Sequence, residues 1–251
     1  MEVVFYGALT TLWWMSSVSV LLPFLLLLKF SKFFRDRWFS FIFERILSPI
    51  YSPIGLPMRK KTFSILEKHL KGRDTFKELE VLEIGIGGGA NLQFYPENSK
   101  LTAVDMNESF KKYFLDNQKK YPHIKYARTV LGVAEDMREV EGSSMDLVVC
   151  TYVLCSVVNL GKALKEVKRV LKPDGKFLFL EHVAYPKSQW GNTVQRFAAP
   201  LWKIYFNGCM LVRDTAEMIR ASGFTNVEME NACPPGMLWL GRPRIMGIAT
   251  K

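Results

Sequence analysis

The sequence predicts a doubly wound α/β fold with a mostly parallel sheet. Five apolar runs have the length of buried strands: 79–85, 100–105, 124–129, 145–153 and 175–183. Helical segments separate most of these runs, as the connections between parallel strands require. A glycine-rich turn also follows the first run, at the edge of the sheet where such folds bind ligands. The chain of 251 residues, 49% apolar and 23% charged, therefore resembles a globular protein and not a disordered or polytopic membrane protein.

The first 28 residues predict a hydrophobic membrane-anchor helix. The 26 residues between Glu2 and Lys29 carry no charge, and as a helix they would span about 39 Å, against about 30 Å for the hydrocarbon core. The acidic start argues against a cleaved signal peptide, and the basic residues that follow favour a cytosolic location for the rest of the chain. Pro23 leaves open whether the segment spans the bilayer or re-enters the same leaflet. The alternative is a buried core helix.

Residues 29–57 are predicted to form a basic and aromatic segment at the membrane interface. Of the formal net charge of +10, residues 29–61 supply +6, so an extended nucleic-acid surface is not expected. Aromatic residues between 34 and 46 recur at helical spacing beside arginines, as in interfacial helices; the alternative is a core helix of the next domain. Three prolines and a glycine predict the junction with the soluble domain, 58–251: Pro49, Pro53, Gly55 and Pro57. An amphipathic helix is expected at 58–72.

The glycine-rich turn and a downstream acid predict an adenosine-type cofactor. Gly85, Gly87 and Gly89 allow a sharp turn that leads into an expected helix through Phe94. Asp105 ends the second strand about 20 residues after the first glycine, where a carboxylate can accept hydrogen bonds from both ribose hydroxyls. The glycines alone do not distinguish a nicotinamide cofactor from S-adenosylmethionine.

Longer motifs resolve this choice, because they resemble those of the class I S-adenosylmethionine-dependent methyltransferases. VLEIGIGGGAN resembles the first motif of that family, TAVD the second, and VAEDM (133–137) the turn beside the adenine. MDLVVCTYVLCSV and LKEVKRVLKPDGKFLFLEH resemble the fourth strand and the helix, turn and fifth strand that follow. The resemblance covers roughly residues 58–251 and implies a Rossmann-like, mostly parallel seven-stranded sheet.

The resemblance also implies a set of cofactor-binding residues. Glu83 would help to orient the methionine end of the cofactor. Val133 occupies a position that is often polar in related enzymes, so Glu135 or Asp136 would replace it as acceptor for the adenine amino group. The full set is Glu83, Gly85, Gly87, Gly89, Asp105, Ala134, Glu135, Asp136 and Thr151.

A closer resemblance concerns the acceptor. The hydrophobic N-terminus, together with GANLQFYP, CTYVLCSV, FLEHVA and RPRIMGIATK, resembles the methyltransferase-like thiol S-methyltransferases of the endoplasmic reticulum and lipid droplets. This implies methylation of alkyl and aryl thiols, including xenobiotic thiols and hydrogen sulfide, by a domain that faces the cytosol at those membranes. Ile86 and Gly88 depart from the family's usual Cys and Thr without removing the three glycines.

A thiol acceptor requires little catalytic machinery, because a free thiol with a pKa near 8.5 is a few per cent ionised at neutral pH. His182, at the end of the fifth strand, is the candidate base, and Tyr152 is expected to line the same pocket; the alternatives are a structural histidine and simple packing. Cys155 is expected to be a core residue. The spacing of the four cysteines and three histidines predicts no metal site.

The aromatic-rich insert after the fifth strand has two interpretations. It forms either an apolar lid that opens toward the membrane or a layer packed against the sheet; its residues are Trp190, Phe197, Trp202, Tyr205 and Phe206.

Other functions stay open at this point. The acceptor could be a lipid, a quinone, a phenol oxygen or a carbon, since the cofactor motifs do not distinguish these. An RNA methyltransferase is disfavoured because the fourth strand lacks an Asn/Asp-Pro-Pro-aromatic motif. A non-enzymatic lipid-droplet protein and a nicotinamide-dependent oxidoreductase rank lower, and the sequence predicts no oligomeric state.

Overall fold

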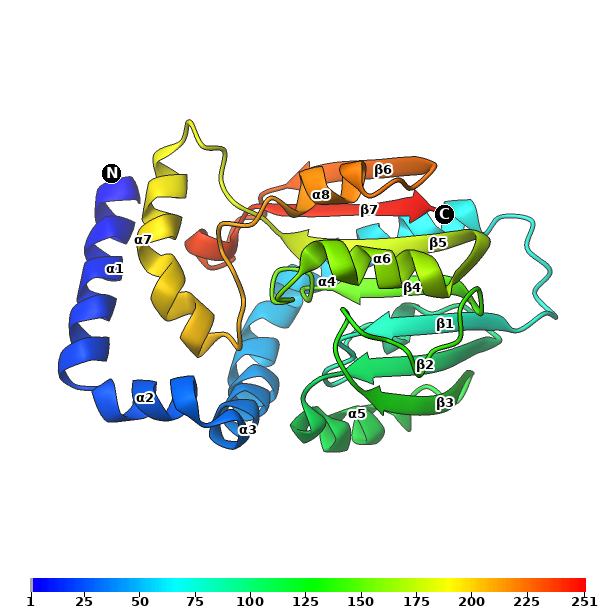
Figure 1. Ribbon diagram of the computed structural model, residues 1–251, viewed down its shortest axis with the longest axis horizontal. Helices are drawn as coiled ribbons and strands as arrows, with labels where there is room; N and C mark the ends of the chain where they lie inside the picture. Colours follow the sequence, from blue (N-terminus) through cyan, green and yellow to red (C-terminus); the bar gives the residue numbers. More distant parts are fainter. Residues whose placement is uncertain (1) are drawn as a thin grey trace.

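The computed structural model describes residues 2–251 and contains a seven-stranded sheet with the order β3-β2-β1-β4-β5-β7-β6 (Figure 1). The strands are β1 (Leu79–Ile84), β2 (Ser99–Asp105), β3 (Ile124–Leu131), β4 (Met145–Thr151), β5 (Leu171–His182), β6 (Asn226–Ala232) and β7 (Arg244–Thr250). The first five are parallel, whereas β7 pairs antiparallel with both β5 and β6. The five strands predicted from apolar runs are confirmed, together with the mostly parallel seven-stranded sheet.

Helices cover both faces of this sheet. On one face, Leu82 and Ile84 of β1 lie in a buried cluster with α6 (Leu160–Val170) and α8 (Thr215–Ala221). On the other, Leu79 and Val81 lie in a second cluster with α4 (Ser48–His69) and α5 (Lys111–Gln118). Because both faces are covered, the central strands are continuous apolar runs without alternation.

The hydrophobic helix predicted for residues 1–28, of which Met1 lies outside the described residues, is divided in two near Pro23, where the sequence left a re-entrant form open. Two helices form instead, α1 (Glu2–Ser19) and α2 (Leu22–Phe30), with an 85° bend between them. The hydroxyl of Ser19 donates to the carbonyl of Met15, a contact that competes with regular helix geometry, and Pro23 begins the second helix. Among residues 2–251, no one helix has both the length and the apolar composition of a membrane span, although this bent pair meets both criteria together.

The helix α1 packs along α7 (Trp190–Tyr205), which is formed by the aromatic-rich insert (Figure 1). The indole nitrogen of Trp14 donates to the carbonyl of Phe197 at 2.9 Å, and the hydroxyls of Ser17 and Tyr205 are 3.0 Å apart. The outer side of α1 stays bare, since Val4 is 77% and Met15 62% exposed. The insert and the N-terminal helices therefore form one structural layer beside the sheet.

The segment predicted as an interfacial stretch and linker is helical except at Ser31, which is extended and lies between α2 and α3. Residues Lys32–Ile42 form α3, a π-helical turn covers Phe43–Leu47, and α4 then runs to His69 without the predicted break at the prolines. The side chains of Phe39 and Phe43 contact Phe110, with ring centroids 6.0 and 6.1 Å apart. The amide of Asn107 donates to the carbonyl of Asp36. These contacts match the alternative of a helix packed on the following domain.

Candidate active site

The glycine-rich turn leaves an open face beside the sheet. Gly85 and Gly87 have φ angles of +70° and +50°, which side chains other than glycine's rarely adopt. A Cβ on Gly85 would lie 2.1 Å from the side chain of Val153, whereas one on Gly87 would meet only Phe110, at 4.0 Å. Gly89 closes the turn by donating its N–H to the carbonyl of Ile86. A ligand can therefore approach the backbone at Gly87.

The helix expected after this turn is only a short 3₁₀ helix, Leu92–Phe94. Tyr95 is already extended because it precedes Pro96, and a residue before proline disfavours helical backbone.

Asp105 lies at the end of β2 with its carboxylate fixed by two backbone groups. One oxygen accepts from the N–H of Gly87 at 2.9 Å and the other from the N–H of Asn107 at 2.8 Å. Burial raises the pKa of this carboxyl, and the two hydrogen bonds oppose that rise. Each oxygen keeps acceptor capacity for a further donor. This geometry suits recognition of a ribose diol beside the open face of Gly87.

Glu83, at the end of β1, holds the residues that follow the glycine-rich turn. It is 1% exposed, and its two oxygens accept from the amide of Asn91 at 2.8 Å and the hydroxyl of Tyr95 at 2.6 Å. Burial raises the pKa of Glu83 to about 7. The same amide of Asn91 donates to the hydroxyl of Thr151, and Arg59 donates to both Asn91 and Thr151. The role of Glu83 at the methionine end of the cofactor stays a prediction, and this network means that Glu83 would act there by positioning other side chains.

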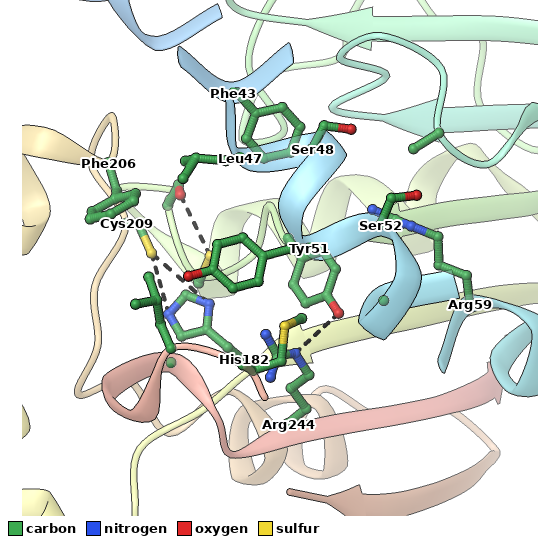
Figure 2. Close-up of a pocket in the computed structure, with 18 of the residues that line it drawn as sticks. Phe43, Leu47, Ser48, Tyr51, Ser52, Arg59, His182, Phe206, Cys209 and Arg244 are labelled. Carbon is green, nitrogen blue, oxygen red and sulfur yellow. Dashed lines mark hydrogen bonds between the residues drawn. The ribbon is translucent and has the colours of Figure 1, made fainter. Parts of the chain in front are cut away.

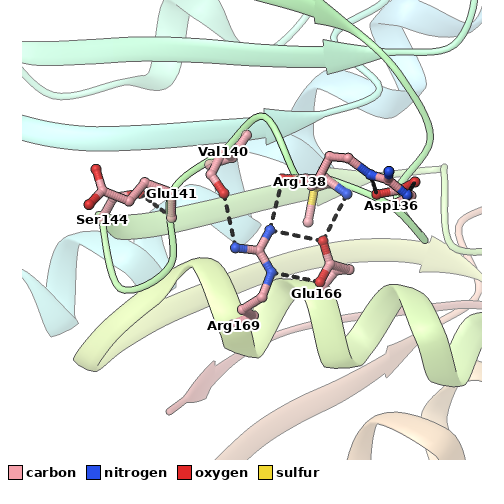
Figure 3. Close-up of polar contacts among 8 residues, drawn as sticks. Asp136, Arg138, Val140, Glu141, Ser144, Glu166 and Arg169 are labelled. Atoms are coloured by element: carbon pink, nitrogen blue, oxygen red, sulfur yellow. Dashed lines mark hydrogen bonds and ion pairs between the residues drawn. The ribbon is translucent and has the colours of Figure 1, made fainter.

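The predicted adenine-flanking turn is held by polar contacts of its own. Ala134 is buried, and one oxygen of Glu135 accepts from the N–H groups of Val158 and Asn159. Asp136 pairs with Arg138 at 2.7 Å (Figure 3). Both candidate acceptors for the adenine amino group therefore have other partners, and their role there stays a prediction.

Beside the cofactor cleft lies a cavity of about 320 Å³, which His182 lines (Figure 2). Tyr152 lines the same cavity. Its walls are mostly apolar and come from residues far apart in the sequence: Phe39, Phe43, Leu47, Tyr51, Arg59, Ala90, Tyr152, Cys155, His182, Trp202, Phe206, Cys209, Leu238 and Arg244. Ala90, at the end of the glycine turn, joins this cavity to the cofactor side. An acceptor bound in the cavity would thus lie next to the cofactor cleft.

Tyr152 has an unusual backbone at the carboxyl end of β4. Its φ angle is +61°, an outlier for a bulky residue. The ring lies between the guanidinium groups of Arg59 and Arg244, each 5.4 Å from the ring centroid, and Arg244 donates to its hydroxyl at 3.1 Å. Strained backbone of this kind persists where the surroundings fix it and is frequent at functional sites.

His182 contacts sulfur atoms on the cavity wall. Its Nε2 lies 3.3 Å from the Sγ of Cys209, which also accepts a hydrogen bond from the indole of Trp202 at 3.1 Å. Cys155 lies in the same cluster and is 1% exposed, as expected of a core residue. Burial raises the pKa of its thiol well above the usual value.

The insert packs inward over part of its length, and its role as a lid stays a prediction. Trp202 is 7% exposed and packs inward, where it lines the cavity with Phe206, whereas Trp190 is 71% exposed. Sequence analysis missed Arg59, Cys209 and Arg244, which no local motif connects to the site.

Comparison with known proteins agrees with this geometry. A family described as a methyltransferase domain matches residues 82–179. Thiol S-methyltransferase TMT1B of Rattus norvegicus is 43% identical over 194 residues, which cover 77% of this chain and 78% of the rat protein. Thiol S-methyltransferase TMT1A of Homo sapiens is 35% identical over 215 residues and 86% of each chain.

This chain belongs to the thiol S-methyltransferase family. Membership makes it an S-adenosylmethionine-dependent methyltransferase, and the open face at Gly87 beside Asp105 fits that cofactor. Solved structures support the fold alone: the YcgJ protein of Bacillus subtilis has a TM-score of 0.57 at 19% identity, over 76% of this chain and 98% of the other. The expected S-adenosylmethionine cofactor and methyltransferase class are confirmed.

Proposed function

We propose that this enzyme methylates lipophilic small-molecule thiols at a membrane surface. The mostly apolar cavity that joins the glycine turn at Ala90 carries this proposal, because it selects an apolar acceptor next to the cofactor. Thiol S-methyltransferases from rat and human are the relatives named above. Alkyl and aryl thiols, including xenobiotic ones, fit such a cavity, and hydrogen sulfide is small enough to enter it.

The reaction requires positioning more than acid–base catalysis. The cofactor supplies an electrophilic methyl group on a sulfonium. Gly87 and Asp105 would hold its ribose side, and the cavity wall orients the thiol and excludes water from it. Because a thiol ionises readily, no strong base is needed. The proton can pass to solvent, and His182, which faces the cavity, would contact the bound acceptor.

The N-terminal helices would bring the enzyme to its lipophilic substrates. A second cavity, of about 380 Å³, lies among α1, α3 and α7, and shares Trp202 and Phe206 with the first. Movement of these shared side chains would join the two cavities into an apolar route from the N-terminal helices to the acceptor site. The bare apolar side of α1 and α2 would enter one leaflet of the endoplasmic reticulum or the surface of a lipid droplet. Basic residues after α2 would keep the domain in the cytosol.

Methyl transfer tests the chemistry. Membranes containing the protein are incubated with labelled S-adenosylmethionine and a panel of alkyl thiols, aryl thiols, phenols, amines and RNA. We expect label in the thiols alone and in none of the acceptors with Asp105→Ala. Transfer to phenols or RNA with equal efficiency would contradict the thiol assignment.

Extraction of membranes with alkaline carbonate tests the attachment. The double variant Leu12→Glu/Met15→Glu should move to the soluble fraction, because both side chains lie on the bare side of α1. Phe76→Glu is the matched control, since Phe76 is 93% exposed and lies outside the N-terminal helices. Retention of the double variant would contradict insertion of α1.

A further inference from the structure

Three soft ligand atoms converge on the wall of the acceptor cavity. Cys155 comes from the loop after β4, His182 from the end of β5, and Cys209 from the segment after α7. Their two sulfur atoms and the imidazole nitrogen all lie within 4.8 Å of one another. All three residues are at most 8% exposed. The spacing of the cysteines in the sequence predicts no metal site, yet the fold brings together a ligand set that a metal ion can use.

The loop that carries Cys155 is fixed from two sides. The carboxylate of Glu181, which is fully buried, accepts from the N–H groups of Val153 and Leu154 at 3.0 Å each. The guanidinium of Arg213 donates to the carbonyl of Leu154 at 2.7 Å. The loop therefore stays in position without help from an ion, as a preorganised site requires.

The two cysteine segments are also joined directly. The N–H of Met210 donates to the carbonyl of Cys155 at 2.9 Å, so Cys209 is held next to that loop. The indole of Trp202 donates to the Sγ of Cys209. Hydrogen bonds of this kind orient a sulfur ligand and stabilise its thiolate.

Two thiolates and one imidazole form a characteristic zinc set. Zn–S bonds of about 2.3 Å and Zn–N bonds of about 2.0 Å in a tetrahedron place the ligand atoms about 3.5–3.8 Å apart. The observed 3.3 Å between the Sγ of Cys209 and the Nε2 of His182, and the limit of 4.8 Å for the whole group, are close to those values. The same sulfur lies 3.9 Å from Nδ1, so the imidazole must turn for a nitrogen lone pair to face the ion. A dication with two thiolates is also electrically neutral, which suits a buried site better than an isolated thiolate.

A fourth coordination position of such an ion would be open to the acceptor cavity. Within residues 2–251 this group has three members, and each of them lines the acceptor cavity (Figure 2). Three protein ligands with one open position are typical of catalytic zinc sites, whereas structural sites are closed by four. The cavity supplies the exogenous ligand, and a thiol is of the soft type that such an ion prefers.

We propose that Cys155, His182 and Cys209 bind one Zn²⁺ ion whose fourth ligand is the acceptor thiol. The identity of that fourth ligand rests on the proposed function. On binding, the thiol loses one proton to solvent and coordinates as a thiolate. Its sulfur then forms a bond to the methyl carbon, while the bond from that carbon to the sulfonium breaks and leaves its electron pair on the departing sulfur. The products are two neutral thioethers, and the methylated one, now a weaker ligand, leaves the ion.

Metal analysis of the full-length protein in detergent tests the site without reference to activity. We expect about one equivalent of zinc in the wild type and less than about a tenth in Cys209→Ser. Replacement by Co²⁺ should give the intense thiolate-to-cobalt absorption of a tetrahedral site. Cys233→Ser is the matched control and should keep the metal, since Cys233 is exposed and lies outside the cluster. Binding of labelled S-adenosylmethionine by each variant checks that the domain is folded.

Addition of an alkyl thiol to the Co²⁺ protein tests the fourth ligand. The visible bands should shift on addition of the thiol and shift back after S-adenosylmethionine is added and methylation consumes the thiol. Wild-type protein that binds S-adenosylmethionine and methylates thiols, but takes up no zinc or cobalt or holds a Cys155–Cys209 disulfide in place of the ion, would overturn the metal site and leave the proposed function intact. Unchanged bands would overturn the role of the thiol as ligand. A bound ion in a protein that methylates only phenols would instead overturn the proposed function.

Discussion

The cofactor side and the acceptor side of the active site differ in how they are assembled. The predicted cofactor side comes mainly from two short stretches, 83–107 and 133–136, to which the fold adds Thr151 and Arg59. Its polar groups are paired with one another and with the backbone. The acceptor side comes from segments as distant as Phe39 and Arg244, and its wall is mostly apolar. Local sequence thus determines which cofactor binds, whereas the tertiary fold determines which acceptor does. Acceptor preference can therefore change without loss of the cofactor site.

The largest expected effect is on the cofactor side. Asp105→Ala removes an acceptor for two ribose hydroxyls, and hydrogen bonds to a charged group contribute about 1.5–3 kcal/mol each. We expect S-adenosylmethionine affinity to fall by at least about 100-fold, measured by calorimetric titration. Asp105→Asn keeps the shape and one acceptor oxygen, so its loss should be smaller. Equal affinity of Asp105→Ala and wild type would contradict the assignment of this carboxylate.

The second effect concerns Glu83, the buried carboxyl group on the cofactor side, and the dependence of stability on pH. The pKa of Glu83 is raised to about 7 by burial, so between about pH 4.5 and 7 the folded protein binds more protons than the unfolded chain. The free energy of unfolding should therefore fall by about 2 kcal/mol as pH rises from 5 to 7.5.

Thermal unfolding at several pH values measures this change. Glu83→Gln can keep contacts with Asn91 and Tyr95 without a titrating group. Between pH 5 and 7.5 the melting temperature of the wild type should therefore fall by about 5 °C more than that of the variant. Parallel curves for the two proteins would show that Glu83 does not titrate there.

A smaller effect is expected on the acceptor side. Tyr152→Phe removes the hydroxyl that accepts from Arg244, which leaves a mostly buried guanidinium with one partner fewer. We expect the KM for thiols to rise about fivefold to tenfold, with S-adenosylmethionine affinity unchanged. Tyr126→Phe on β3 is the control, because its hydroxyl contacts Thr129 outside the cavity. A change in cofactor affinity with Tyr152→Phe would break the division between the two sides.

The smallest expected effect comes from a contact between the N-terminal segment and the cofactor side. Glu44, in the π-helical turn, accepts from the N–H of Gly88 at 3.1 Å, so the N-terminal segment contacts the cofactor turn. Burial raises the pKa of this carboxyl. Glu44→Ala should weaken cofactor binding about threefold, while Glu44→Gln retains the acceptor. Tighter binding by Glu44→Ala would mean that this carboxylate competes with the cofactor for the N–H group.

The same division explains what the sequence could predict. The glycine turn and Asp105 lie within about 20 residues of each other, so their spacing alone indicates a cofactor cleft. The five parallel strands are buried on both faces and were recognisable as apolar runs. In contrast, β6 is largely exposed, and the helix at Pro53 and Pro57 persists because its packing offsets the missing hydrogen bonds. Cys209 and Arg244 reach the cavity only through the fold, which no local pattern records.

The last two residues of β5 limit where insertions and deletions can occur in the sequences of this family. Glu181 and His182 are neighbours in a strand, where successive side chains point to opposite sides: the first holds the loop after β4 and the second enters the cavity. One inserted residue before Glu181 would move its carboxylate to the cavity position and place Leu180 under the loop. One deleted residue would instead place the imidazole of His182 under the loop and Val183 at the cavity. Insertions and deletions should therefore be tolerated after Val183, in the connection to α7, and rejected between Lys176 and His182.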